Sequence, residues 1–135
     1  MYSKFESEVV IRPDDIDMNN HVHNSRYLDY VLAARYEQMR RDYKMSMDEF
    51  VKRGFSWVVN ECFIQFKRPL LLGDRIIIRT GVLEVGNTAA KVGFEIFKQE
   101  NRKLASEGYF NYTLVNIKTG RAEKLPEDII QMYSV

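Results

Sequence analysis

Four long runs of strand-forming residues follow one another after Gly54, and no other feature of the sequence constrains the fold as strongly. Each run is rich in Val, Ile, Phe, Tyr or Thr, which favour β-strands, and turn-forming segments separate the runs. In the third run the apolar residues alternate with small or charged ones, as in a strand with one buried face: Ala90, Val92, Phe94 and Ile96. Short turns between consecutive strands predict antiparallel neighbours, so we expect a four-stranded meander over residues 56–67, 74–85, 88–99 and 103–116.

The first part of the chain predicts one further strand and one long helix. Residues 5–12 alternate loosely and contain β-branched side chains, and Pro13 ends the pattern. Residues 25–42 carry apolar side chains at helical spacing, and we expect the helix to be buried along Leu28, Val31 and Leu32. Such a helix must be covered, and the sheet is the available cover. The expected fold is α+β, a single domain over residues 1–135 with an antiparallel sheet of about five strands wrapped around one long central helix.

Capping residues indicate where two helices begin. Asn24 or Ser25 can cap the long helix, because a side-chain oxygen at that position accepts from the free N–H groups of the first turn. Ser46 and Glu49 have the spacing of a capping box, which predicts a short helix that runs to Lys52 and is closed by Gly54.

Charge and composition exclude several classes of protein. The net charge is +1, which argues against a nucleic-acid binder that must neutralise many phosphates. Apolar runs are far shorter than the roughly 20 residues that span a bilayer, so we expect no membrane insertion. The single cysteine, Cys62, cannot form an internal disulfide, and the N-terminus has no apolar signal segment. We therefore expect a cytoplasmic protein.

Both histidines lie in one polar segment, residues 12–27, between the first strand and the long helix. The start of a helix presents unpaired N–H groups and the positive end of its dipole. The segment brings carboxylates, imidazoles and carboxamides to this point, which indicates a chemical function.

Simpler roles are also open to the residues of this segment. Asp14 and Asp15 are most simply solvated turn residues. The two histidines could bind a metal with Asp17, but no second Cys/His cluster accompanies them. A calcium loop is rejected, because Asn20 replaces the required Gly and Arg26 stands at the position of the bidentate Glu. His21 and Asn24 could also simply cap the helix.

Two motifs resemble those of hotdog-fold thioesterases, the 4-hydroxybenzoyl-CoA thioesterase superfamily. Asp15 to Tyr27 reads D-x-D-x-x-x-H-V-x-N-x-x-Y, and Phe66 to Asp74 reads aromatic-x-x-P-x-x-x-G-D. The first motif also resembles the catalytic segment of plant acyl-carrier-protein thioesterases. Asn20 stands where most members carry Gly and His23 where an Asn is usual. The plant enzymes also have a glutamate near the position of Gln65, for which Glu61 is the candidate substitute.

The resemblance implies hydrolysis of an acyl thioester without a cofactor or metal. Asp17 would act as general base or as direct nucleophile, and the residues alone do not separate these roles. The backbone N–H of Asn24 would stabilise the oxyanion, because the start of a helix presents an oriented donor with partial positive charge. His21 and Asn19 would orient water or the thioester, and His21 could protonate the leaving thiolate.

The resemblance also implies a substrate and an assembly. The acyl group of an acyl-CoA or acyl-ACP would lie in an apolar cleft, and the candidate lining residues are Tyr27, Trp57 and Phe66. Lys67 and Arg68 are candidates for contacts with coenzyme A phosphates. The acyl chain and its carrier stay open. Family members join two sheets edge to edge with the active site at the interface, so we expect a homodimer or a homotetramer, which would also cover an open sheet edge.

Three other functions compete with hydrolysis. A non-catalytic hotdog module that binds an acyl thioester would lack the carboxylate of the motif, but Asp17 is present. A hotdog dehydratase or hydratase would have a Gly/Pro-rich segment after its histidine, and none follows His21 or His23. A purely structural interaction domain is the remaining possibility.

Overall fold

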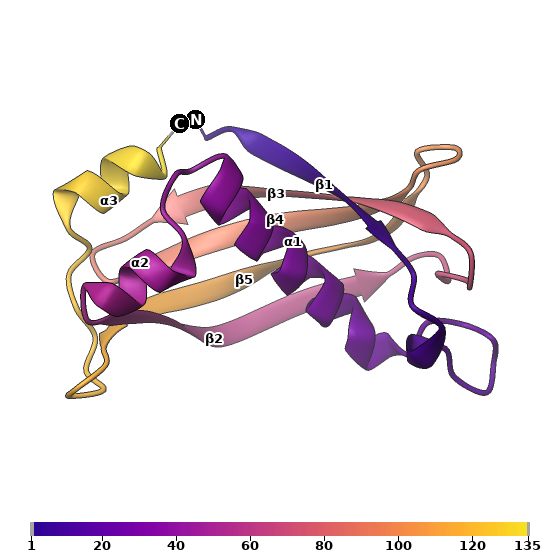
Figure 1. The fold of residues 1–135 in the computed structure, drawn as a ribbon, viewed down its shortest axis with the longest axis horizontal. Helices are drawn as coiled ribbons and strands as arrows, with labels where there is room; N and C mark the ends of the chain where they lie inside the picture. The colour runs from indigo at the N-terminus through magenta and orange to yellow at the C-terminus, as the bar shows by residue number, and fades with distance from the viewer. Residues whose placement is uncertain (1, 135) are drawn as a thin grey trace.

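Five antiparallel strands form one sheet in the structure, a computed structural model that describes residues 2–134 (Figure 1). Together with one long helix they confirm the predicted α+β fold. Each predicted strand is present within a few residues of its expected bounds. The strands are β1 (Lys4–Val10), β2 (Phe55–Phe66), β3 (Arg75–Val85), β4 (Ala89–Lys98) and β5 (Leu104–Asn116).

The strand order β1-β3-β4-β5-β2 corrects the predicted four-stranded meander. Strands β3, β4 and β5 do follow one another through short turns, but β2 pairs with β5 and not with β3. The connection over residues 67–74 is longer than the two to five residues of a typical hairpin loop. This connection carries the chain across the sheet, which makes β1 and β2 the two edge strands.

Helix α1 (Tyr27–Arg41) crosses one face of the sheet diagonally (Figure 1). Its buried side chains differ from the predicted stripe, because Val31 is fully buried whereas Leu28 and Leu32 are only partly buried. The side chains turned most directly to the sheet are Tyr27, Tyr30, Val31, Ala34, Arg35, Gln38 and Met39. Apolar spacing alone missed this face because four of its members carry polar groups that find partners inside the protein.

Two short helices and two short 3-10 turns complete the fold. Helix α2 (Met47–Lys52) begins as predicted, with the Ser46 side chain accepting from the N–H of Glu49 at 3.4 Å, and Gly54 follows it at φ +86°. Helix α3 (Glu127–Met132) was not predicted, since six residues carry too little periodicity. The 3-10 turns are Pro13–Asp15 and Asn24–Arg26. None of the helices within residues 2–134 combines the length and the apolar character that a membrane span requires.

The buried side chains form two clusters on the helix-covered face. One lies between α1 and strands β3 to β5, and it includes Val31, Ile78 and Phe94. The other joins the end of α1 to α2 and α3 through Phe50 and Ile129. The N-terminal end of α1 and its preceding segment therefore rest on a packed support.

Candidate functional site

The segment that precedes α1 folds back on itself around a tight turn at Asp17 to His21. The backbone N–H of Asp17 donates to the carbonyl of His21 at 2.9 Å, and the N–H of Asn20 donates to the carbonyl of Asp17 at 3.1 Å. Asn20 has φ +63°, the left-handed region that glycine and asparagine tolerate best. This conformation gives a physical reason for an asparagine at this position.

The carboxylate of Asp17 is held by one oxygen and open at the other. Its Oδ1 accepts from the N–H of Asn19 at 2.9 Å and from the N–H of His21 at 3.4 Å. Its Oδ2 forms no hydrogen bond with residues 2–134, and the side chain is partly buried. The backbone therefore orients this carboxylate and leaves one oxygen able to accept a proton.

The two histidines have different surroundings. The ring of His23 caps the 3-10 turn, because its Nδ1 accepts from the N–H of Ser25 at 3.2 Å and lies 2.7 Å from the Ser25 hydroxyl. Neither Asn24 nor Ser25 caps α1 as expected: the N-cap residue of α1 is Arg26, which forms no side-chain cap, and His23 caps the 3-10 turn before it. The exposed ring of His21 has no hydrogen-bond partner in the part of the chain that the structure describes. His21 is the histidine that remains available to a ligand.

The backbone N–H of Asn24 also lacks a partner. It is the first N–H of the 3-10 turn before α1, and no acceptor within residues 2–134 bonds to it. The following N–H groups, those of Ser25 and Arg26, both bond to His23. An exposed, unpaired N–H at the start of a helix can donate to an anion.

The hydroxyl of Tyr30 on α1 anchors this loop, a role that no sequence pattern predicted. Tyr30 donates to Asp15 Oδ2 at 2.5 Å and accepts from the N–H of Arg12 at 3.1 Å. Burial raises the pKa of Tyr30 to about 12, so its hydroxyl stays protonated. Asp15 is therefore not a solvated turn residue: its side chain is only 11% exposed. The place of Tyr30 on the face of the predicted helix that also carries Tyr27 is the only signal of this role in the sequence.

Asp14, in contrast, is solvated as expected. It is exposed and forms a salt bridge with Arg12, with 2.9 Å between Oδ2 and Nη2. The hydrogen bond from Arg12 lowers the pKa of the Asp14 carboxyl. The neighbouring Asp14 and Asp15 thus have opposite environments.

Tyr27 and Phe66 connect the loop to the end of β2. Tyr27 is buried, and its hydroxyl accepts from the N–H of Leu70 at 3.1 Å. Its ring meets the ring of Phe66 edge to face at 4.9 Å between centroids. Phe66 is 46% exposed, so it offers an apolar surface beside the loop, whereas Tyr27 is a core residue.

Lys67 and Arg68 follow Phe66 on the surface. Lys67 Nζ lies 3.9 Å from a carboxylate oxygen of Glu107, and Arg68 Nη1 donates to the carbonyl of Leu104 at 2.6 Å. Both side chains are exposed. They follow directly on Phe66 and remain open to a phosphate.

Glu61 does not join the loop. Glu61 and Gln65 lie on the same face of β2. Cys62 and Ile64 lie on the other face, where they pack against the core under α1. Glu61 Oε1 accepts from Asn111 Nδ2 at 2.8 Å on the opposite face of the sheet. Within the described residues the Glu61 carboxylate therefore bonds to Asn111 and makes no hydrogen bond to the Asp17 loop.

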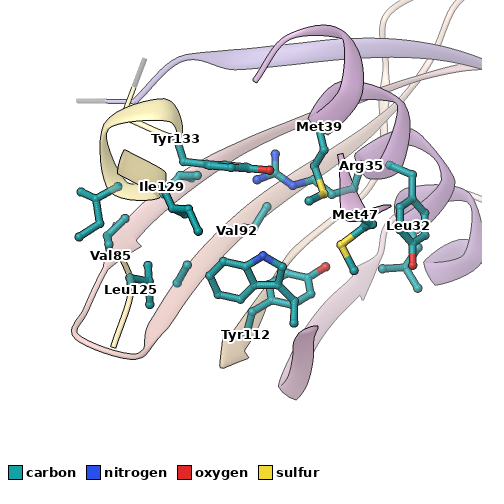
Figure 2. Close-up of a pocket in the computed structure, with 15 residues that line it drawn as sticks. Leu32, Arg35, Met39, Met47, Val85, Val92, Tyr112, Leu125, Ile129 and Tyr133 are labelled. Atoms are coloured by element: carbon teal, nitrogen blue, oxygen red, sulfur yellow. The ribbon is translucent and has the colours of Figure 1, made fainter. Parts of the chain in front are cut away.

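An apolar pocket of about 130 Å³ lies between the helices and the sheet (Figure 2). It has roughly ten times the space of about 10–15 Å³ that one water molecule requires, so it is more than a packing defect. Trp57 lines it together with side chains from α1, the sheet and α3, among them Leu32, Met39, Tyr112 and Ile129. Trp57 thus lies at the far end of β2 from Phe66, and the two do not share one cleft within the protomer.

Residues 2–134 contain no group of three or more His, Cys, Asp or Glu side chains arranged to hold a metal ion. His21, His23 and Asp17 therefore do not come together as metal ligands, since the ring of His23 is used by the cap.

Comparison with known proteins identifies the family of the chain. The chain is 19% identical to the long-chain acyl-CoA thioesterase FadM of Escherichia coli over 124 residues, 92% of each chain. It is 27% identical to the chloroplastic acyl-acyl carrier protein thioesterase ATL3 of Arabidopsis thaliana over 100 residues, 73% of this chain but 51% of that one. Its fold superimposes on a DHNA-CoA thioesterase of Staphylococcus aureus with a TM-score of 0.90 at 18% identity, covering 97% and 89% of the two chains. The family profile described as the thioesterase-like superfamily matches residues 11–132, and the chain belongs to this superfamily.

Proposed function

We propose that this protein hydrolyses an acyl thioester, with Asp17 as the group that activates the attack. The observation that carries the proposal is the pairing of two open groups in one loop. Asp17 has an oriented carboxylate with a free Oδ2, and Asn24 has an unpaired N–H at the start of a helix. Acyl transfer requires both a proton acceptor and a donor for the developing oxyanion.

The reaction would proceed through a tetrahedral intermediate. Asp17 Oδ2 takes a proton from water as the water oxygen attacks the carbonyl carbon, and the N–H of Asn24 donates to the resulting oxyanion. When the carbonyl forms again, the C–S bond breaks and the thiolate leaves, taking a proton from His21 or from solvent. In the alternative route the Asp17 carboxylate attacks the carbonyl carbon directly, the C–S bond breaks and the thiolate leaves as a mixed anhydride forms, and water then hydrolyses that anhydride to the free acid and the Asp17 carboxylate.

Asn19 and His21 support this chemistry from the same loop. Their backbone N–H groups fix Asp17 Oδ1, and the free His21 ring can orient water or protonate the thiolate. Cys62 is not a competing nucleophile, because burial raises the pKa of its thiol and keeps it protonated. A single unpaired thiol also fits the reducing cytoplasm, where we expect the protein to act.

An acyl-CoA is the substrate we favour. The relative named for acyl-CoA matches this chain over nearly its full length, whereas the chain spans about half of the relative named for acyl-acyl carrier protein. The exposed Lys67 and Arg68 can reach anionic groups at the mouth of the loop, as the phosphates of coenzyme A require.

We further propose a homodimer formed through the edge of β2. In the described part of the chain this strand pairs only with β5, and its apolar side chains Val58, Val59, Phe63 and Phe66 are 42% to 46% exposed. An exposed apolar edge favours pairing with another strand. Pairing by a two-fold axis would run the two copies of β2 antiparallel.

This dimer would combine the two halves of the site. Antiparallel pairing would set the Phe66 end of one β2 beside the Trp57 end of the other. The Asp17 loop packs at the Phe66 end through Tyr27, and Trp57 lines the apolar pocket. The acyl group attacked at one subunit would therefore extend into the pocket of the partner subunit.

Asp17→Asn tests the catalytic proposal. The change keeps the size of the side chain but removes its charge and its capacity to accept a proton, so turnover of acyl-CoA substrates should fall by at least about 100-fold. Binding of a non-hydrolysable acyl-CoA analogue should change much less. Asp14→Asn is the matched control, because Asp14 is exposed, and it should keep near wild-type activity. Full activity in Asp17→Asn would refute the proposal.

Sedimentation tests the dimer. The wild type should sediment as a dimer or a dimer of dimers at micromolar concentration. Phe63→Lys, which adds a charge to the β2 edge without touching the Asp17 loop, should shift the equilibrium toward monomer and lower activity in parallel. A monomeric wild type with full activity would exclude the composite site.

A further inference from the structure

Arg35 is the only charged residue among the buried residues of the described chain. It is 8% exposed, and the other members of the buried polar set are uncharged. It is also the only charged residue among the fifteen that line the apolar pocket. A buried charge is normally paired with an opposite charge, since burial removes the water that would solvate it.

No such pair exists for Arg35 within residues 2–134. Its Nη1 donates to two neutral hydroxyls, those of Tyr43 at 3.3 Å and Thr80 at 3.2 Å. Its guanidinium lies over the Tyr43 ring at 4.7 Å and beside the Tyr133 ring at 5.9 Å. None of the salt bridges formed by residues 2–134 includes it.

The unused donors of Arg35 open into the pocket. Its Nε and Nη2 have no hydrogen-bond acceptor in the described chain. In that part of the chain, every side-chain nitrogen or oxygen that is sealed from solvent has a hydrogen-bond partner. Nε and Nη2 therefore reach open space, and Arg35 lines the pocket. Figure 2 shows its guanidinium beside the Tyr133 ring on the α1 side of the cavity.

The arrangement matches one kind of ligand. The walls are apolar and suit a hydrocarbon chain, and the single guanidinium offers a fork of donors that fits a carboxylate. The other arginines without a salt bridge, Arg40, Arg68 and Arg121, are exposed and solvated. Only at Arg35 would a ligand supply the counter-charge that the fold omits.

We propose that Arg35 recognises the end of the acyl group opposite the thioester, and that the preferred substrates carry a carboxylate there. The proposal rests on the thioesterase function above, and it names the class of substrate as thioesters of α,ω-dicarboxylic acids. A chain ending in methyl would leave the guanidinium facing apolar surface. A carboxylate at the chain end would neutralise it and accept from two donors.

Matched pairs of substrates test this preference. The wild type should be assayed with CoA thioesters ending in carboxylate or methyl at eight, ten, twelve and fourteen carbons. At the best length, kcat/KM should be at least about tenfold higher for the carboxylate. A methyl-terminated chain preferred at every length would overturn the proposal, while the methyl series would still report the hydrolytic function.

Variants assign the preference to Arg35. Arg35→Met keeps an apolar stem without the charge, and the ratio of the two kcat/KM values should fall to about one or below. Arg40→Met removes an exposed arginine of the same helix and should keep the wild-type ratio. An unchanged ratio in folded Arg35→Met would refute the assignment.

Binding provides a readout that is independent of both hydrolysis and variant folding. The monomethyl ester of dodecanedioic acid should raise the melting temperature of the wild type at a concentration where methyl dodecanoate does not. A raised melting temperature with the monomethyl ester, but no hydrolysis of any CoA thioester, would refute the catalytic proposal and support the role of Arg35. Equal effects of the two esters would reject that role.

Discussion

Tyr30→Phe is the sharpest test of how the fold supports the loop. The change removes one oxygen atom from a side chain that is 5% exposed and leaves its ring in place. That oxygen donates to Asp15 at 2.5 Å and accepts from the N–H of Arg12 at 3.1 Å. No other side chain of α1 bonds to both ends of the 3-10 turn Pro13–Asp15 in the described structure.

The expected loss follows from these two bonds. A hydrogen bond to a charged group contributes about 1.5–3 kcal/mol, and a backbone N–H left without a partner adds about 1 kcal/mol. Asp15 keeps only a longer contact, 3.4 Å between its Oδ1 and Nε of Arg26, so it compensates little. We expect the free energy of unfolding to fall by about 2.5–4 kcal/mol.

Urea unfolding at pH 7 measures this loss, and all variants are compared at one protein concentration because the stability of the proposed dimer would depend on concentration. Tyr36→Phe is the control, since Tyr36 is 53% exposed on the same helix, and its change should stay within about 0.5 kcal/mol. In Tyr30→Phe, kcat should fall more than KM rises, because the hydroxyl positions the loop without touching substrate. A loss below about 1 kcal/mol would refute the anchoring role.

Three further changes probe packing and ionisation. Gly108→Ala should lower the free energy of unfolding by at least about 3 kcal/mol or prevent folding, because the added Cβ would lie 1.9 Å from the carbonyl oxygen of Phe63. A melting curve like that of the wild type would contradict the strand geometry. Ile78→Ala should lower the free energy of unfolding in urea by about 2–5 kcal/mol, because Ile78 is fully buried. Leu32→Ala, at a half-buried pocket position, should lower it by less than about 2 kcal/mol. The reverse order would contradict the burial of these two side chains. Burial raises the pKa of Tyr112 to about 12 from its ordinary 10.0, so the unfolded state releases this proton first and stability should decline as the pH rises from 10 toward 12. Tyr112→Phe should flatten that decline, and an unchanged slope would count against the buried hydroxyl.

The sequence predicted those features whose signal is local. Alternation in β4 identified its buried residues Val92, Phe94 and Ile96, and the capping box located α2 from Ser46 and Glu49 alone. The loop around Asp17 was proposed as the site in the same way, because its polar residues lie within one short stretch. Local patterns reflect backbone preferences and side-chain periodicity, which do not depend on the rest of the chain.

Features set by distant partners could not be predicted. The position of β2 at the sheet edge depends on pairing with β5, more than forty residues later in the chain at Phe63↔Tyr109. Burial of Arg35 depends on Thr80, and the anchoring role of Tyr30 depends on a loop that precedes the helix. Helical spacing identifies a face, but it does not show which polar side chains on that face find partners.

Mixed dimers join the two proposals in one experiment. If Asp17 of one subunit acts on a chain held by Arg35 of the partner subunit, a dimer of one Asp17→Asn chain and one Arg35→Met chain contains one site with both wild-type residues and one with neither. Such dimers should regain about half of the wild-type kcat/KM on the carboxylate-ended substrate, although neither parent dimer has it. If both residues act within one subunit, each site of the mixed dimer lacks one of them and the preference for carboxylate is not restored. Restored activity without restored preference would therefore reject the composite site and leave the single-subunit arrangement.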